Sequence, residues 1–306
     1  MGVTDVIGVM SALPTISIVV PNYNGAATLG QTLQSLVDQQ YPGLEIIVVD
    51  GGSTDGSVDI IRQYERHLTW WVSEKDRGQA HAINKGFAHC TGQIVNWLCS
   101  DDLLKPGALH RVGALFAQRP EVDVIAGQCH MEHRRPGQVP RTVMHGPVDE
   151  GQVTLMPSTD PIAQPSCFWR RRFMDRQPAL DESYHFAMDF ELWMYFQTRH
   201  AVWLVIPDVL STFVMTGDNK TSTGGWRIYE ETRRVYQTYR PEPIPLTFWH
   251  RHFRHPLQMV LRRRRHTLQG RCARVLLGAI DWTLTPFYGY WRVRVMDWSG
   301  LIDPGP

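Results

Sequence analysis

The chain has 306 residues, 43% of them hydrophobic, and 31 basic side chains against 30 acidic ones, for a net charge of +1. This length fits one large domain with an appendage, or two modest ones, and the near-neutral total argues against a nucleic-acid partner. The chain lacks an apolar run of about eighteen residues and a signal-peptide layout, and its five cysteines are scattered without zinc-ligand spacing. We therefore expect a cytoplasmic protein with reduced, mostly buried thiols, with a disulfide as the alternative.

Strands alternate with short helices through the first hundred residues. Apolar, β-rich runs predict strands at 15–20, 45–50, 68–72 and 93–98, and helical spacing of apolar side chains predicts helices between them. This alternation predicts an α/β fold with a doubly wound, mostly parallel sheet. Ligands of such sheets bind at the carboxyl ends of the strands. Those ends are polar in all four strands: Asn22-Tyr23-Asn24, Asp50-Gly51-Gly52, Ser73-Glu74 and Ser100-Asp101-Asp102.

The second part of the chain continues with mixed elements. A helix is expected after Pro106, strands at 123–127, 164–170 and 202–206, an irregular hairpin at 128–145, and a helix at 186–197. Glycines cluster near 217–225 and indicate a boundary there. We expect a tail at 1–14, a catalytic domain at 15–220, divided into a donor half (15–104) and an acceptor half (105–220), and a helical extension at 221–306.

Two adjacent carboxylates follow the fourth strand, at Asp101 and Asp102. Neighbouring carboxylates repel one another unless a cation or hydrogen-bond donors offset the charge. A divalent ion such as Mg²⁺ binds one or two protein carboxylates together with phosphate oxygens. The alternative is that these acids cap the helix after Pro106. The segment 73–79 leading into 84–86 suits ribose and phosphate contacts, although a solvated loop has the same composition.

Four motifs, in this order and spacing, resemble glycosyltransferase family 2: Val20-Pro21-Asn22-Tyr23-Asn24, Val48 to Gly56, Ser73 to Phe87 and Ser100-Asp101-Asp102. The resemblance covers about residues 15–215. It implies a GT-A fold, a nucleotide-diphospho-sugar donor and inversion at the anomeric carbon. It implies that Pro21, Tyr23, Asp50 and Asp76 hold the nucleoside, that Asp101 contacts ribose or sugar, and that Asp102 holds Mn²⁺ or Mg²⁺. The further donor-side candidates are Asn24, Arg77, Gly78, Asn84 and Lys85.

The acceptor half is similar to the same family at 163–170 and 187–193. The resemblance implies that Asp189 is the catalytic base, which deprotonates the acceptor hydroxyl. The other acceptor-side candidates are Gln164, Trp169, Glu191, Trp193 and Lys220. Lys220 lies in the segment 216–222, where relatives carry a loop with a basic residue over the diphosphate, and a plain surface loop is the alternative. Two positions depart from the family pattern: Met188 replaces an acid before the base, and Tyr195 replaces an arginine.

The tail has a different composition, since residues 251–274 carry eight arginines and no acid. Arginines interleaved with aromatic residues on amphipathic helices suit the inner face of the cytoplasmic membrane, and a lid packed on the catalytic domain is the alternative. The sequence thus predicts a metal-dependent glycosyltransferase of cell-envelope polysaccharide biosynthesis, peripheral on that membrane. It would use a UDP-, dTDP- or GDP-linked sugar and a glycan or lipid-linked acceptor. The alternative function is a catalytically silent nucleotide-sugar-binding scaffold.

Overall fold

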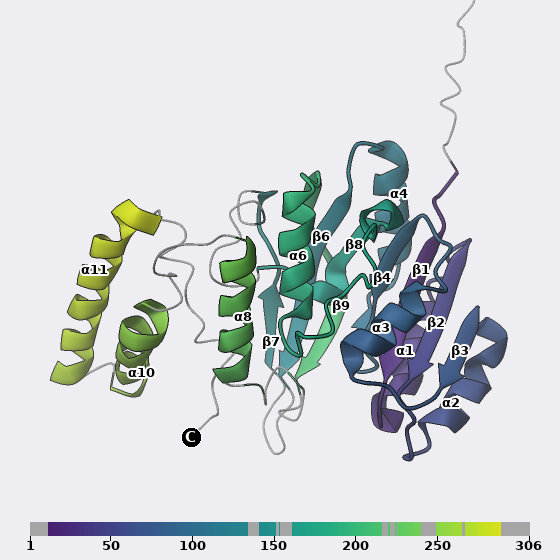
Figure 1. Ribbon diagram of the computed structural model, residues 1–306, viewed down its shortest axis with the longest axis horizontal. Helices are drawn as coiled ribbons and strands as arrows, with labels where there is room; N and C mark the ends of the chain where they lie inside the picture. Colours follow the sequence, from purple (N-terminus) through teal and green to yellow (C-terminus); the bar gives the residue numbers. More distant parts are fainter. Residues whose placement is uncertain are drawn as a thin grey trace, which may run out of the picture.

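The computed structural model describes residues 12–133, 141–150, 153, 161–215, 220, 224, 226–239, 249–264 and 267–288. Nine strands form one sheet in the order β3-β2-β1-β4-β8-β6-β9-β5, with β7 paired to β6. Helices cover both faces of this sheet, and two further helices lie beyond it (Figure 1). The structure therefore has the mixed α/β architecture that the sequence predicts.

The first four strands are parallel and carry the donor-side motifs. They are β1 (Ile16–Asn22), β2 (Leu44–Asp50), β3 (Trp70–Ser73) and β4 (Ile94–Trp97). β1 pairs with β2 and β4, and β2 pairs with β3, each in parallel. Because β1 and β4 are buried throughout, they read as continuous apolar runs rather than alternating ones. The register places Asn22 beside Asp50 and Asp50 beside Ser73, so three of the predicted polar strand ends meet.

The helices divide between the two faces of the sheet. One core layer contains apolar side chains of α1 (Ala26–Val37), α2 (Ser57–Tyr64) and α4 (Ala108–Gln118). The other contains those of α3 (Gln79–Phe87), α6 (Met188–Thr198) and α8 (Trp226–Tyr239). A sheet with helices on both faces is doubly wound, as expected.

The second half of the sheet contains β8 (Cys167–Arg170), β6 (Val124–His133), β7 (Arg141–His145), β9 (Trp203–Met215) and β5 (Asp102–Leu104). β8 runs antiparallel to β4 and β6, whereas β6 and β9 are parallel. β9 extends well past the strand expected at 202–206. Its far end pairs with β5, with Asp102 opposite Phe213. Residues 164–166 form a 3-10 turn rather than the start of a strand.

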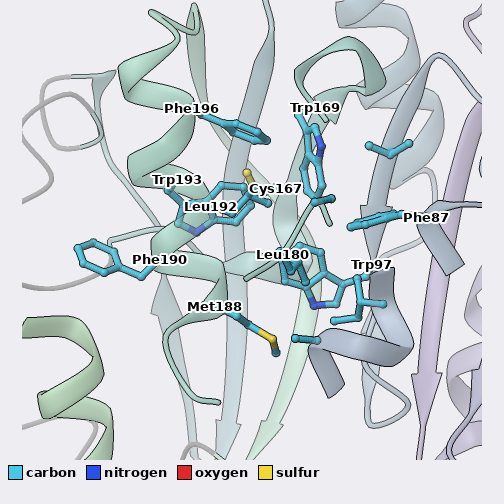
Figure 2. Packing of buried hydrophobic residues seen from close by; sticks show 14 of the residues in the cluster. Phe87, Trp97, Cys167, Trp169, Leu180, Met188, Phe190, Leu192, Trp193 and Phe196 are labelled. Atoms are coloured by element: carbon cyan, nitrogen blue, oxygen red, sulfur yellow. The ribbon is translucent and has the colours of Figure 1, made fainter. Parts of the chain in front are cut away.

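An aromatic cluster joins the sheet to α6 (Figure 2). The Trp97 and Trp193 rings stack with centroids 6.2 Å apart, and the Trp169 ring meets both edge-on, at 5.6 and 5.5 Å. All three side chains are at most 1% exposed. Edge-to-face and offset pairs are favoured geometries for buried rings, each worth about 0.5–1.5 kcal/mol beyond area burial. The cluster therefore fixes the position of α6, which carries Asp189, relative to the sheet.

The helices after residue 220 differ in what they pack against. α8 packs against α6, and its Val235 and Tyr236 are buried in the core. α10 (His255–Arg263) and α11 (Leu268–Tyr288) pair with each other beyond α8, away from the sheet (Figure 1). The compact unit thus continues past the boundary expected at 220 and includes α8. Among the described residues, no helix combines the length and the apolarity that crossing a bilayer requires.

Candidate active site

Asp50 organises the turn that follows β2. Its carboxylate is fully buried and accepts five hydrogen bonds, from Asn22 Nδ2, from the backbone N–H groups of Gly52 and Ser53, and from the hydroxyls of Ser53 and Ser73. Burial alone would raise the pKa of Asp50, but these donors outweigh it and hold the pKa below its usual value. Asp50 is therefore ionised and stabilises the donor-side turn. In this structure both of its carboxylate oxygens already accept hydrogen bonds from the chain.

An exposed platform lies directly above that turn. Tyr23 is 68% exposed, and a side chain on Gly51 would come within 2.6 Å of Asp76 Oδ2 and 3.2 Å of the Tyr23 ring. Only glycine leaves this space open, so Tyr23 and Asp76 approach each other across the Gly51 backbone. An aromatic face beside a carboxylate suits a nucleobase, which stacks on the one and donates to the other. This platform lies at the residues predicted from the sequence to hold the nucleoside.

The remaining donor-side candidates lie around this platform with partners of their own. Pro21 is buried in β1, and Asn24 Oδ1 accepts from the Thr54 backbone N–H at 3.0 Å. Gly78 has φ +123° and donates its N–H to Asp76 Oδ1 at 2.8 Å, which holds that carboxylate in place. Arg77 pairs with Glu182, Lys85 pairs with Glu74, and Asn84 bonds the backbone of Leu180 in both directions.

These last contacts change the interpretation of the segment 73–86. Arg77 and Asn84 both reach the 180–182 turn of the acceptor half, through Glu182 and Leu180. The segment is exposed in part, since the Arg77 side chain is 69% exposed, but Arg77, Lys85 and Asn84 already have partners within the chain in this structure. It links the donor half to the acceptor half at the side of the site.

A cavity of about 250 Å³ lies between the donor turn and α6. Residues from both halves of the catalytic domain and from α8 line it: Gln79, Trp97, Cys99, Asp101, Asp102, Cys129, Met131, His145, Ile162, Ala163, Gln164, Pro165, Ala187, Met188, Asp189, Phe190, Phe213, Lys220, Ile228 and Thr232. Asp101, Asp102, Gln164, Asp189 and Lys220, which the sequence analysis selects from four separate segments, therefore share one cavity.

Asp102 is only 1% exposed, and its Oδ1 has no hydrogen-bond partner among the described residues. Burial raises the pKa of Asp102 well above its usual range, and the charge of Asp101 raises it further. The ligand atoms of Cys99, Asp101 and Asp102 lie within 4.8 Å of one another. A buried, unpartnered carboxylate oxygen beside a second carboxylate is what a divalent cation requires, so these residues fit a metal. The alternative role as a helix cap is wrong, because Asp102 begins β5 and Gly107 precedes α4.

Asp189 lies on the first turn of α6 and is partly buried. Burial raises the pKa of its carboxyl group, whereas the Phe190 N–H, which donates to Oδ1 at 2.8 Å, and the Lys220 charge lower it. Glu231 of α8 accepts the backbone N–H groups of His185, Phe186 and Ala187 at 3.0, 2.6 and 2.9 Å. α8 thus holds the turn from which Asp189 projects.

Lys220 lines the cavity beside the start of α3. Its Nζ donates to Gln79 Oε1 at 2.9 Å and lies 5.7 Å from the centroid of the Phe186 ring. Burial lowers the pKa of Lys220, while the charges of Cys99, Asp189 and Glu231 act in the opposite direction. The basic group expected over the diphosphate therefore lies at the cavity that holds the carboxylates. The rest of the expected loop, apart from Lys220, is outside the described residues.

Three acceptor-side candidates are placed elsewhere. Trp169 and Trp193 are fully buried in the aromatic cluster. Glu191, 2% exposed, forms a buried ion pair with Arg176 and accepts the hydroxyl of Tyr239. This corrects the expectation for all three, because a side chain enclosed by the core cannot contact an acceptor. Periodicity already separates Glu191 from Asp189 on α6, since residues two apart on a helix face different ways.

Several cavity residues were not selected from the sequence. Gln79 links Lys220 to Cys99, to whose Sγ it donates at 3.1 Å. His145 of β7 lines the cavity, and burial lowers its pKa. Thr232 of α8 also lines it, although it lies beyond the expected domain boundary. Only Gln79 and Cys99 carried a usable signal, because Gln79 lies inside the motif Ser73 to Phe87 and Cys99 immediately precedes Ser100-Asp101-Asp102.

Comparison with known proteins gives a consistent result. The family model "Glycosyl transferase family 2" matches residues 17–177. A glycosyltransferase of Nostoc sp., described as uncharacterised, is 36% identical over 120 residues, 38% of this chain and 36% of that one. A PGL/p-HBAD biosynthesis glycosyltransferase of Mycobacterium bovis is 33% identical over 124 residues, 39% of this chain and 48% of that one. The match thus spans less than half the length of these curated relatives.

Two solved structures share the fold. TarS 1–349 of S. aureus in complex with UDP has a TM-score of 0.56 and 18% identity, over 92% of this chain and 89% of that one. The mannosyltransferase PcManGT of Pyrobaculum calidifontis, in complex with GDP-Man and Mn²⁺, has a TM-score of 0.53 and 20% identity, over 93% of this chain and 74% of that one. The arrangement of the sheet and its helices is therefore that of known GT-A proteins, as the sequence analysis expects.

Proposed function

Because this chain belongs to glycosyltransferase family 2, we propose that it transfers a sugar from a nucleotide-diphospho-sugar to a hydroxyl group of a glycan or lipid-linked acceptor, with inversion at the anomeric carbon. One observation carries the proposal. A single cavity brings the carboxylates of Asp101 and Asp102, which follow the donor-side sheet, together with Asp189 of the acceptor half. A cation site and a base on either side of one reacting carbon are what inverting transfer requires.

The donor binds across the carboxyl ends of the parallel strands. Its base stacks on Tyr23 and donates to Asp76, whose orientation the Gly78 N–H fixes. Asp50 holds the turn beneath and supplies negative charge close to the base. From there the diphosphate reaches the cavity edge, where Asp101 contacts the ribose or the sugar.

Asp102, with Asp101, would hold Mn²⁺ or Mg²⁺ at the diphosphate. The ion, when bound, offsets the charge that develops on the leaving diphosphate. Lys220 adds a second positive charge on the same side of the cavity. Its link to Gln79 keeps the ammonium group directed into the cavity, where displaced water makes its attraction for phosphate oxygens stronger.

Asp189 accepts the proton of the acceptor hydroxyl. The acceptor oxygen forms a bond to the anomeric carbon as the bond from that carbon to the diphosphate breaks, and the proton moves to a carboxylate oxygen of Asp189. The raised pKa of Asp189 brings its basicity closer to the operating pH, which favours proton transfer. Gln164, whose Nε2 donates to Asn96 Oδ1 and to the Trp97 backbone carbonyl, forms a fixed polar wall for the sugar or the acceptor.

We propose that the acceptor belongs to cell-envelope polysaccharide biosynthesis, and the biosynthetic roles in the names of two relatives support this proposal. One is a glycosyltransferase of PGL/p-HBAD biosynthesis. The sugar and the acceptor differ among such proteins, so we propose the class of acceptor, a glycan or a lipid-linked glycan of polysaccharide biosynthesis, and not its identity.

A thermal-shift screen with UDP-, GDP- and dTDP-sugars and Mn²⁺, followed by a transfer assay with the donor that binds, tests this function. A donor at 100 times its Kd stabilises the protein by about 2.7 kcal/mol, which shifts the Tm measurably. We expect one nucleotide class to stabilise, and Tyr23→Ala to remove most of that shift. If the protein binds a nucleotide-sugar but neither hydrolyses nor transfers any donor, the transferase proposal is refuted and the scaffold role is favoured.

We also propose that α10 and α11 contact an anionic membrane surface. Leu268, Val275 and Trp282 recur every seven residues on α11 and are 76%, 72% and 81% exposed. Arg271 and Arg274 are exposed on the same helix. Exposed apolar and basic side chains together favour an interfacial position over a lid packed on the domain. Arg254, which immediately precedes α10, forms an ion pair with Asp281 of α11.

Vesicle co-sedimentation tests the membrane contact. Each arginine near an anionic surface contributes about 1 kcal/mol, so we expect Arg271→Ala with Arg274→Ala to weaken binding to phosphatidylserine vesicles by about 30-fold. Transfer to a soluble acceptor should stay at the wild-type rate, because neither arginine lines the cavity. Equal binding to uncharged phosphatidylcholine vesicles, or no effect of the two substitutions, would refute the contact.

A further inference from the structure

The cation site proposed above contains a sulfur atom. The Sγ of Cys99 lies within 4.8 Å of the ligand oxygens of Asp101 and Asp102, at the start of the turn from which both carboxylates project. Across the described residues, this is the one cluster of three or more histidine, cysteine or acidic side chains with metal-ligand spacing. The resemblance to the family concerns the two acids and assigns no role to Cys99.

A second observation indicates that the cluster is built to receive a cation. Asp102 is 1% exposed and lines the cavity, and within the described part of the chain its Oδ1 lacks a hydrogen-bond partner. An unsatisfied buried carboxylate oxygen carries a desolvation cost that a cation removes. Hydroxyl and amide donors offset the charge of Asp50, but no donor from the residues that the structure describes reaches Asp102 Oδ1.

The side chain that contacts the Cys99 sulfur could support a metal-bound thiolate. Cys99 Sγ accepts a hydrogen bond from Gln79 Nε2 at 3.1 Å, and Gln79 in turn accepts from Lys220. Burial raises the pKa of Cys99 well above its usual value, and the charges of Asp102 and Asp101 raise it further, so a bound metal has to displace the thiol proton. The Gln79 donor would then stabilise the negative charge of the metal-bound thiolate. Gln79 therefore acts as an outer partner of the cluster, as the groups around metal ligands commonly do.

We propose that Cys99 is a ligand of the cation site, which makes it a mixed thiolate and carboxylate site. It would bind thiophilic divalent ions, such as Co²⁺, Zn²⁺ or Cd²⁺, through Cys99, Asp102 and Asp101. Mg²⁺, which takes oxygen ligands, would use the carboxylates alone. The thiol proton is released to solvent as the metal–sulfur bond forms. The inference rests on the cation site of the proposed function, and it predicts that Zn²⁺ and Cd²⁺ displace Mn²⁺.

Cobalt titration of the full-length protein tests the ligand directly. A thiolate bound to Co²⁺ absorbs in the near ultraviolet, and carboxylate ligands do not. We expect this band to appear at one equivalent of Co²⁺ in the wild-type protein and to be absent in Cys99→Ser. By calorimetry, the same substitution should weaken Cd²⁺ binding by about tenfold or more and change Mn²⁺ binding much less.

Two thiols elsewhere supply matched controls. Cys129 lines the same cavity but does not belong to the cluster, and Cys272 is exposed on α11. Cys129→Ser and Cys272→Ser should both keep the cobalt band. Retained Mn²⁺ binding in Cys99→Ser shows that the variant is folded.

The outcomes separate this inference from the proposed function. A band that survives in Cys99→Ser, or that disappears in Cys129→Ser, overturns the assignment of Cys99. Saturable binding of Co²⁺ without any sulfur band does the same. Glycosyl transfer measured with Mn²⁺ or Mg²⁺ depends on neither result, so the transferase proposal stands or fails on its own assay.

Discussion

Asp189→Asn is expected to lower the turnover number for glycosyl transfer by about 10²–10⁴-fold, the contribution that a positioned general base makes. The asparagine side chain has nearly the same shape and can still accept the Phe190 N–H that Asp189 Oδ1 accepts. It cannot take up a proton from the acceptor. Donor binding should stay within about twofold of the wild type, because Asp189 lies on the acceptor half of the cavity, outside the nucleoside platform.

The pH dependence gives an independent check. Because burial raises the pKa of Asp189, its carboxylate forms only at a higher pH than an ordinary aspartate. The base must be ionised to act, so the wild-type rate should fall as pH falls through that raised pKa. Asp189→Asn should lack this acidic limb altogether. A variant that kept the limb would place the titrating base at another residue.

Asp175→Asn is the matched control for this substitution. Asp175 lies in the same half of the domain, with a 38% exposed side chain paired with Arg199, and it does not line the cavity. An exposed ion pair contributes about 0–1 kcal/mol, so this variant should fold and turn over as the wild type does. Wild-type turnover in Asp189→Asn itself would refute the assignment of the base.

The donor side was predictable because its signals are local. A strand that ends in a polar turn places its side chains at the edge of a parallel sheet whatever the rest of the chain does. Asn22, Asp50 and Ser73 meet as this rule predicts. The sequence could not show that the Asp50 carboxylate accepts five hydrogen bonds from the chain. The bonds from Asn22 and Ser73 depend on the register between separate strands.

The acceptor side depends on contacts that sequence patterns do not encode. Trp169 and Trp193 match a motif, but both side chains point into the core. This orientation follows from their packing with Trp97, which comes from a third element. Asp102 joins a short strand only because β9 continues to Phe213, beyond its apolar start. α8 forms part of the cavity through Thr232 although polar residues dominate its sequence. Long-range packing decided all three.

Asp102→Asn is expected to abolish divalent-dependent turnover, with a loss of about 10³-fold if the cation contributes several kcal/mol to the transition state. The asparagine side chain has almost the same volume, but it lacks the charge that would hold the ion. Turnover at varied Mn²⁺ concentration measures this effect. Asp38→Asn serves as the control, because Asp38 lies at the end of α1 and does not line the cavity.

The same substitution should affect stability in the opposite direction. The raised pKa of Asp102 means that the folded state binds its proton more tightly than the unfolded state does. The stabilising contribution of that proton is present below the ordinary aspartate pKa and is lost as pH rises through the folded-state pKa. In EDTA, Asp102→Asn should therefore be more stable than the wild type, by on the order of 1–3 kcal/mol at neutral pH, and the difference should shrink as pH falls.

Adding Mn²⁺ should then reverse the order of the two proteins. The wild type gains free energy of unfolding in proportion to the logarithm of ion concentration above its Kd, and the variant gains little. Melting curves with EDTA and with Mn²⁺, at two pH values, measure both effects. A variant that is less stable than the wild type in EDTA would show that Asp102 is a structural acid. A buried carboxylate that lowers the free energy of unfolding without a cation, and raises it when a cation is bound, is instead a cation ligand.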